Sequence, residues 1–190
     1  MSIRLFRDFV CELTNLADQG SGEAEMLGAA RPMLSDLLAR DTWLPDEFAR
    51  PNENFYQQYL LHCDLKQRFS IVSFVWGPGQ ETPIHDHTVW GLLGVLRGSE
   101  VSQRYEMNEG ELHETGGLEI LEAGAIDAVS PTIGDIHRVR NGRPNKPSVS
   151  IHLYGGNIGA ISRHAFKGDG TVKDFTSGYS LETVPNLWTR

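Results

Sequence analysis

The sequence has few of the residues that would mark a secreted, disulfide-bonded protein or a nucleic-acid binder. Only two of its 190 residues are cysteines, Cys11 and Cys63, and they do not lie at a metal-ligand spacing. This excludes a disulfide framework and fits a reducing cytoplasm. Lysine and arginine total 17 against 25 acidic residues, so the formal net charge is -8 and the basic face that nucleic acid requires is missing.

A long uncharged apolar run is also missing. Arg4, Arg7 and Asp8 interrupt the apolar N-terminal stretch, so we expect neither a signal peptide nor a transmembrane segment. The length suits one domain with a sizeable core. We expect a single domain over 1–190, with a helical part at 1–50, a β-barrel at 55–166 and a C-terminal tail at 167–190.

Two helices are expected before the barrel. The first has apolar residues at spacings of three and four, namely Phe6, Phe9, Val10, Leu13 and Leu16, a pattern typical of an amphipathic helix. The second covers about 23–40, and Pro32 should break or restart it. The polar faces are not basic, so we expect the helices to pack on the barrel rather than on a membrane.

From residue 55 onward the pattern changes to short strands separated by turns. Aromatic and β-branched residues dominate these segments, and Gly, Pro and Asn lie between them. The expected strands are 55–62, 68–76, 89–96, 101–107, 118–121, 137–139, 149–154 and 161–166. Gly91 and Gly94 interrupt the third, which suggests a close backbone approach there. The sequence therefore predicts a mainly β sandwich or closed roll.

Two segments carry histidines that could bind a metal. His85 and His87 are two residues apart, so in a strand both side chains point to one face. His137, on a later strand, would supply a third imidazole. An isolated His-x-His is more often a surface pair, but here a turn precedes each segment, at Gly79 and at Gly134. Three histidines would leave one side of the ion open.

A further pattern lies at Ser150, His152 and Tyr154, which alternate with Val149, Ile151 and Leu153. The polar residues could form the exposed face of an amphipathic strand. Alternatively they could form a relay inside the barrel, with Ser150 bonding one nitrogen of His152 and Tyr154 bonding the other. The alternation alone does not choose between these interpretations.

The two histidine segments resemble the two motifs of the cupin superfamily, which has a double-stranded β-helix, or jelly roll, fold. Ordinary cupins carry a glutamate ligand shortly after His-x-His, but here that position is Gly91, and no acidic residue lies between His87 and Glu100. Without that carboxylate a divalent ion keeps its full charge, which suits a thiolate ligand.

Together with Ser-x-His-x-Tyr, the motifs resemble the thiol dioxygenases, non-haem Fe(II) enzymes such as cysteine dioxygenase. The resemblance covers about 56–166. It implies that His85, His87 and His137 hold Fe(II), and that Ser150, His152 and Tyr154 form a catalytic triad around the ligands. The implied partners are a small thiol and O2.

Two differences from the mammalian-type enzymes indicate which members of that family the chain resembles. Mammalian-type enzymes have a cysteine that crosslinks to the tyrosine, but Gly91 stands there. They also bind the carboxylate of the substrate with an arginine, where this chain has Gln58. Gln58 with Arg163 from a late strand resembles the bacterial 3-mercaptopropionate dioxygenases, which implies that Arg163, Gln58 and Tyr154 bind substrate. Without the resemblance, Arg163 would be an ordinary surface arginine.

The resulting hypothesis is a dioxygenase that converts 3-mercaptopropionate to its sulfinic acid. Two alternatives remain. One is cysteine dioxygenase, which produces cysteine sulfinate. The other is a metal-binding cupin without oxygen chemistry, because three histidines also suit zinc. The sequence does not fix the oligomeric state.

Overall fold

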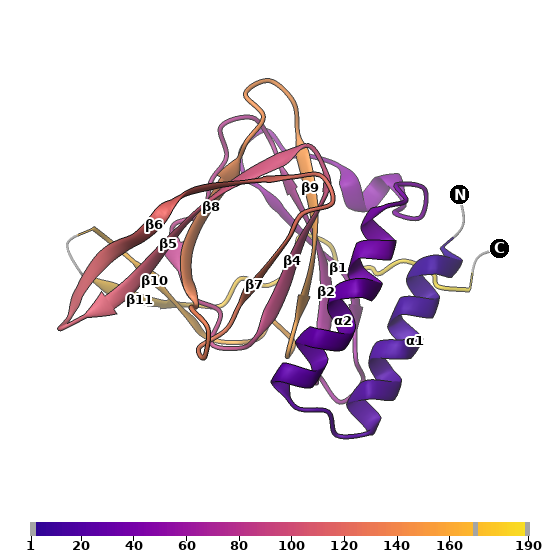
Figure 1. Ribbon diagram of the computed structural model, residues 1–190. Coiled ribbons are helices and arrows are strands. Elements are labelled where there is room, and N and C mark those ends of the chain that lie inside the picture. Colours follow the sequence, from indigo (N-terminus) through magenta and orange to yellow (C-terminus); the bar gives the residue numbers. More distant parts are fainter. Residues whose placement is uncertain (1–2, 169–170, 189–190) are drawn as a thin grey trace.

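The computed structural model describes residues 3–168 and 171–188, and it consists of two antiparallel sheets with two helices outside them (Figure 1). The helices are α1 (Arg4–Asp18) and α2 (Glu23–Leu38), followed by the 3₁₀ turn η1 (Asp46–Ala49). The strands are β1 (Gln57–Cys63), β2 (Ser70–Trp76), β3 (Ile84–His85), β4 (Gly91–Arg97), β5 (Ser99–Asn108), β6 (Glu111–Glu122), β7 (Ile126–Val129), β8 (Ile136–Asn141), β9 (Ser148–Tyr154), β10 (Arg163–Phe166) and β11 (Val172–Phe175).

The strands form a five-stranded sheet, in the order β1-β2-β9-β4-β7, and a six-stranded sheet, in the order β11-β10-β3-β8-β5-β6. From β2 to β5, and again from β6 to β10, successive strands alternate between the two sheets. This alternation winds the chain into a double-stranded β-helix. The expected fold class, a mainly β cupin jelly roll with N-terminal helices packed on it, is confirmed.

Both helices lie against the outer face of the five-stranded sheet (Figure 1). In α1 the buried residues are Phe6, Phe9, Val10 and Leu13, so the expected apolar stripe is confirmed. In α2 the predicted break is wrong, because Pro32 lies inside one continuous helix. The apolar face of that helix, including Leu34, is buried against β4, and this packing offsets the backbone hydrogen bond that proline cannot donate.

The five-stranded sheet is buried on both faces, which is unusual for an antiparallel sheet. All residues of β2 and β9 are buried. One face, with Ile71, Ile151 and Leu153, joins the helices in one hydrophobic core. The opposite face points into the barrel, where Val72 and Trp76 belong to a second core. The polar residues of β9 are therefore buried rather than exposed.

The strand assignments need three corrections. β7 and β11 were not expected, and β11 lies in what the sequence suggested was only a C-terminal tail. β7 is short and only partly buried, and β11 is mostly exposed, so neither has a strong hydrophobic pattern. β3 ends at His85, so His87 lies beyond it. Among the helices of the described residues, none has the length and apolarity to cross a lipid bilayer.

Candidate metal centre

Three buried histidines from two segments converge on one point inside the barrel. β3 and β8 pair so that His85 lies directly opposite His137. The centroid of the His87 ring is 4.9 Å from that of His85 and 4.8 Å from that of His137. One ring nitrogen of each histidine lies within 4.8 Å of the other two. This is the arrangement that a single metal ion needs.

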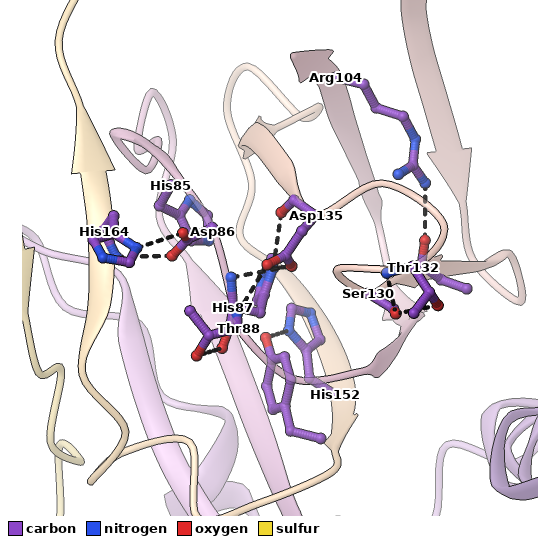
Figure 2. Close-up of polar contacts among 12 residues, drawn as sticks. His85, Asp86, His87, Thr88, Arg104, Ser130, Thr132, Asp135, His152 and His164 are labelled. Atoms are coloured by element: carbon purple, nitrogen blue, oxygen red, sulfur yellow. Dashed lines mark hydrogen bonds and ion pairs between the residues drawn. The ribbon is translucent and has the colours of Figure 1, made fainter. Parts of the chain in front are cut away.

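A carboxylate, rather than strand geometry, holds His87 in place. Asp135 accepts a hydrogen bond from the His87 backbone N–H at 3.1 Å and from Thr88 N–H at 2.9 Å. The same carboxylate lies 3.0 Å from His87 Nδ1 (Figure 2). The two rings do lie close together, as expected. The expected reason, that both residues belong to one strand, is wrong, because β3 ends at His85. Asp135 lies two residues before His137 in the sequence, and this proximity to a candidate ligand could have identified it as a residue that orients a histidine.

The hydrogen bonds leave ring nitrogens free to coordinate an ion. His85 Nδ1–H donates to the Pro83 carbonyl at 3.0 Å, and His87 Nδ1–H donates to Asp135. Each bond fixes the tautomer in which Nε2 carries a lone pair. His137 Nδ1 is buried without a hydrogen-bond partner among the described residues.

Burial keeps the imidazoles of His85 and His137 neutral. It lowers the pKa of His85 to about 3, with a further contribution from His87. Burial also lowers the pKa of His137 well below its ordinary value. Neutral imidazole is the form that ligates metal. Three imidazole nitrogen donors at this separation fit a divalent transition metal such as Fe(II) or zinc.

The side chains of Ser150, His152 and Tyr154 face these histidines from the other sheet. Ser150 Oγ lies 2.8 Å from His152 Nε2, and His152 Nδ1 lies 2.8 Å from the Tyr154 hydroxyl. All three are buried. Of the two interpretations of the alternation on β9, the structure therefore supports the interior relay. The Tyr154 ring also stacks on the His87 ring at 5.6 Å, so relay and histidine cluster are in contact.

The electrostatics of the relay favour its neutral form. Burial lowers the pKa of His152 well below its ordinary value, and it raises the pKa of the Tyr154 phenol. The His152 ring stacks on Phe74 at 4.2 Å, which fixes its orientation. Tyr154 therefore stays protonated at neutral pH and presents a hydroxyl group, not a phenolate, to its surroundings.

Gly91 lies directly opposite Tyr154 in the pairing of β4 and β9. A Cβ atom at this position would lie 2.9 Å from Cδ1 of the Tyr154 ring. At Gly94 it would lie 2.5 Å from Leu38 Cδ1 of α2. Both glycines therefore permit close approaches, as expected. Cys11 and Cys63 are both free thiols on other elements.

Arg163 is not a surface arginine, since it is only 3% exposed. Its Nη2 donates to Ser177 Oγ at 2.6 Å and its guanidinium lies 4.6 Å from the Phe175 ring centroid, but its buried Nε has no partner among the described residues. Burial lowers its pKa, while the nearby Tyr154 phenol opposes that shift. Arg163 forms no ion pair with a carboxylate of the described residues, and such a buried cation is a potential binding site for an anion.

Gln58 lies on β1, and its side-chain Oε1 is buried without a partner among residues 3–168 and 171–188. Its backbone bonds to Ser180. A small cavity lies at the histidine cluster, and neither Gln58 nor Arg163 is part of its lining. The cavity is lined by Phe74, Trp76, Thr82, His85, His87, His137, Val139, His152 and Tyr154.

The remaining polar residues near the site have structural partners. Asn141 Nδ2 donates to the carbonyls of Trp76 and Gly77, so it closes a turn. Asp86 accepts from the His164 backbone N–H at 2.7 Å and lies 2.6 Å from His164 Nδ1 (Figure 2). This contact joins β10, which carries Arg163, to the segment of His85 and His87.

Comparison with known proteins relates the chain to one family. The sequence model of the family described as cysteine dioxygenase type I matches residues 45–166. Cysteine dioxygenase type 1 of Danio rerio is 29% identical over 112 residues, which cover 57% of this chain and 55% of that protein. The match thus spans about half the length of that curated relative.

Solved structures with similar folds include an uncharacterized protein with a double-stranded β-helix domain from Klebsiella pneumoniae. It has 23% identity and a TM-score of 0.46, and the match covers 63% of this chain and 94% of that one. A cupin superfamily protein from Desulfitobacterium hafniense has 14% identity and a TM-score of 0.46, with 62% and 94% covered.

Proposed function

Since this chain belongs to the cysteine dioxygenase type I family, we propose that it is a non-haem Fe(II) thiol dioxygenase acting on a small thiol carboxylate, with 3-mercaptopropionate as the preferred substrate. One observation carries the proposal, namely that three histidines converge within electrostatic influence of the buried guanidinium of Arg163, whose Nε has no partner among the described residues. In the reaction both atoms of O2 are added to sulfur. Sulfur loses four electrons and O2 gains four, so no other reductant is needed.

His85, His87 and His137 would hold the iron. When bound, Fe(II) would supply positions for the thiolate and for O2, together with the electronic chemistry that activates them. The donor set contains no carboxylate, so an anionic sulfur would offset part of the charge of a divalent ion held there. The hydrogen bond that His87 Nδ1–H donates to Asp135 keeps that ring oriented for coordination.

Arg163 would bind the carboxylate of the substrate. A guanidinium can donate two parallel hydrogen bonds to a carboxylate, and Arg163 Nε still lacks an acceptor in the described structure. The electrostatic influence of Arg163 on both Tyr154 and His85 supports a position beside the site. Tyr154 would add its hydroxyl, and Gln58 would complete the binding of the thiol acid.

Substrate preference follows from charge. Among the residues that the structure describes, none of those lining the cavity is acidic, so no lining carboxylate would balance the ammonium group of cysteine. 3-Mercaptopropionate lacks that group and avoids the cost of its desolvation. Cysteine remains the second candidate, because Gln58 Oε1 is a buried acceptor without a partner among the described residues. The free Cys11 and Cys63 support a reducing location, which we propose to be the cytoplasm.

The direct test is oxygen uptake by iron-loaded protein with 3-mercaptopropionate, L-cysteine and cysteamine, with the product identified by mass spectrometry. We expect the highest kcat/KM with 3-mercaptopropionate and a product heavier by two oxygen atoms. A higher kcat/KM with L-cysteine would make the protein a cysteine dioxygenase. If no thiol supports oxygen uptake, the dioxygenase proposal is wrong.

Arg163→Gln should raise KM for 3-mercaptopropionate at least tenfold, since it removes the charged partner of the carboxylate. The control is Arg140→Gln, which changes an exposed arginine on β8. An unchanged KM in Arg163→Gln would remove this residue from substrate binding.

His137→Ala should abolish iron binding and turnover together, because two histidines are too few to retain the ion. Metal content is measured by mass spectrometry of the purified protein, with His113→Ala, an exposed histidine on β6, as control. Full iron content in His137→Ala would disprove the ligand assignment. A wild-type protein that takes up only zinc would favour the metal-binding cupin without oxygen chemistry.

A further inference from the structure

The barrel interior contains a buried carboxyl group that the proposed reaction does not use. Glu100, on β5, is 2% exposed. It has no ion pair with a cation in the part of the chain that the structure describes, and its Oε1 has no hydrogen-bond partner there. An unpaired acidic side chain inside a protein is costly unless it can be protonated. Burial accordingly raises the pKa of Glu100 to about 7.

Glu100 lies at the far end of the relay on β9. The groups that face its carboxyl are the Ser150 hydroxyl of β9 and the Trp76 indole of β2, and both favour its ionised form. Its strand neighbours are Leu121 on β6 and Asn141 on β8. None of these four residues carries a charge. The influence of Glu100 extends to Tyr154, whose pKa it helps to raise.

The relay of Ser150, His152 and Tyr154 therefore extends to a fourth group, the Glu100 carboxyl. The order is Tyr154, His152, Ser150 and Glu100, and the first two contacts are 2.8 Å long. Neutral His152 carries one hydrogen, on Nδ1 or on Nε2. Tyr154, His152 and Ser150 can each donate and accept, whereas Glu100 donates only when protonated, so the protonation state of Glu100 fixes the direction of all hydrogen bonds in the row.

We propose that Glu100 is a positioning residue that decides which nitrogen of His152 carries the hydrogen, and thereby whether the Tyr154 hydroxyl donates to His152 or into the metal cavity. The location of the carboxyl beside Ser150 carries this inference. Its consequence for catalysis rests on the proposed function, but the hydrogen-bond directions do not.

With Glu100 ionised, the carboxylate accepts the Ser150 O–H. Ser150 Oγ then accepts from His152 Nε2–H, and His152 Nδ1 accepts from the Tyr154 O–H. In this state the phenol oxygen offers only lone pairs to the cavity. Trp76 Nε1–H, 3.4 Å from Ser150 Oγ, is compatible with this direction because the serine oxygen has two lone pairs.

With Glu100 protonated, each bond reverses. The carboxyl O–H donates to Ser150 Oγ, the Ser150 O–H donates to His152 Nε2, and His152 Nδ1–H donates to the Tyr154 oxygen. The Tyr154 O–H is then free to donate into the cavity, where a substrate carboxylate or an oxygen atom can accept it. The two states differ by one proton, which resides on Glu100.

The test is the tautomer of His152, measured by long-range ¹H–¹⁵N correlation on the full-length protein with ¹⁵N-labelled histidine. Zn²⁺ is added as a diamagnetic probe for the three-histidine site. Between pH 5.5 and 8.5 we expect the hydrogen of His152 to move from Nδ1 to Nε2, with a midpoint near pH 7. A tautomer that does not change over this range would overturn the proposal, and this result needs no variant.

Glu100→Gln supplies the matched variant, because a glutamine amide can donate to Ser150 as the protonated carboxyl does and cannot ionise. We expect His152 to keep the hydrogen on Nδ1 at every pH. Glu119→Gln, on exposed β6, is the control and should retain the wild-type transition. A transition that persists in Glu100→Gln would assign it to another group and refute the role of Glu100.

Kinetics separate this inference from the proposed function. If Tyr154 must donate into the cavity, kcat/KM of the wild-type protein falls as pH rises through 7, whereas that of Glu100→Gln is flat between pH 6 and 8. A protein that consumes no oxygen but shows the tautomer change would refute the dioxygenase and leave the role of Glu100 in place. An active dioxygenase in which the His152 tautomer does not change with pH would support the proposed function and refute the role of Glu100.

Discussion

At the scale of single residues, the space around Tyr154 depends on a missing side chain. Gly91 faces Tyr154 across two paired strands, and the Tyr154 ring is held by His152 on one side and by His87 on the other. The ring cannot move away from a new neighbour without breaking one of these contacts. A thiol at position 91 would lie against the ring, and its absence leaves no partner there for a thioether.

Gly91→Ala should therefore displace Tyr154 and destabilise the protein by about 1–3 kcal/mol, as overpacking in a core does. The added Cβ would approach Tyr154 Cδ1 to 2.9 Å. The free energy of unfolding is measured in urea, and kcat should fall as well. Gly117→Ala is the matched control, because nothing lies within 4 Å of its added Cβ. Equal stabilities of the two variants would contradict the packing argument.

At the scale of elements, one carboxylate organises the connection between β1 and β2. Asp64 accepts hydrogen bonds from the backbone N–H groups of Lys66 and Arg68, and Arg68 forms two further bonds to it through Nε and Nη2. This turn closes the β1–β2 pair, in which Cys63 lies opposite Ser70. The contacts with Arg68 lower the pKa of Asp64 to about 2.

A depressed carboxyl pKa stabilises the fold above the ordinary value of 3.8, and this contribution is lost as pH falls toward 2. Asp64→Asn should lower the free energy of unfolding by about 1 kcal/mol at pH 7, a modest value because Arg68 is partly solvated. Urea unfolding at pH 7 and pH 3 checks this, and the difference between the two proteins should shrink at pH 3. A difference that stays constant would contradict the ion pair as its cause.

At the scale of the whole molecule, the two faces of the five-stranded sheet serve different purposes. The outer face and the helices form one core, and the inner face forms a second core that includes Tyr154. The helices therefore stabilise the sheet on which the relay lies without contributing residues to the cavity lining. Stability and metal binding should respond separately to changes in the outer core.

Leu34→Ala tests this separation. Leu34 of α2 is fully buried in the outer core, so its truncation should cost about 2–5 kcal/mol. The affinity for the metal, measured below the unfolding transition, should remain within about twofold, because Leu34 does not line the cavity. A twofold change corresponds to about 0.4 kcal/mol. A large loss of metal affinity in folded Leu34→Ala would show that the two cores are coupled.

The sequence by itself determined the identities of the histidines, the alternation of β9 and the mainly β class, because these follow from motif spacing and from the period of a single strand. Only the tertiary structure decided that the polar face of β9 is interior, since exposed and buried polar faces have the same alternation. It also placed Asp135 on His87, buried Arg163, and brought Glu100 to Ser150. These contacts join segments that are far apart in sequence, and local periodicity contains no information about which strands pair or which sheet faces which.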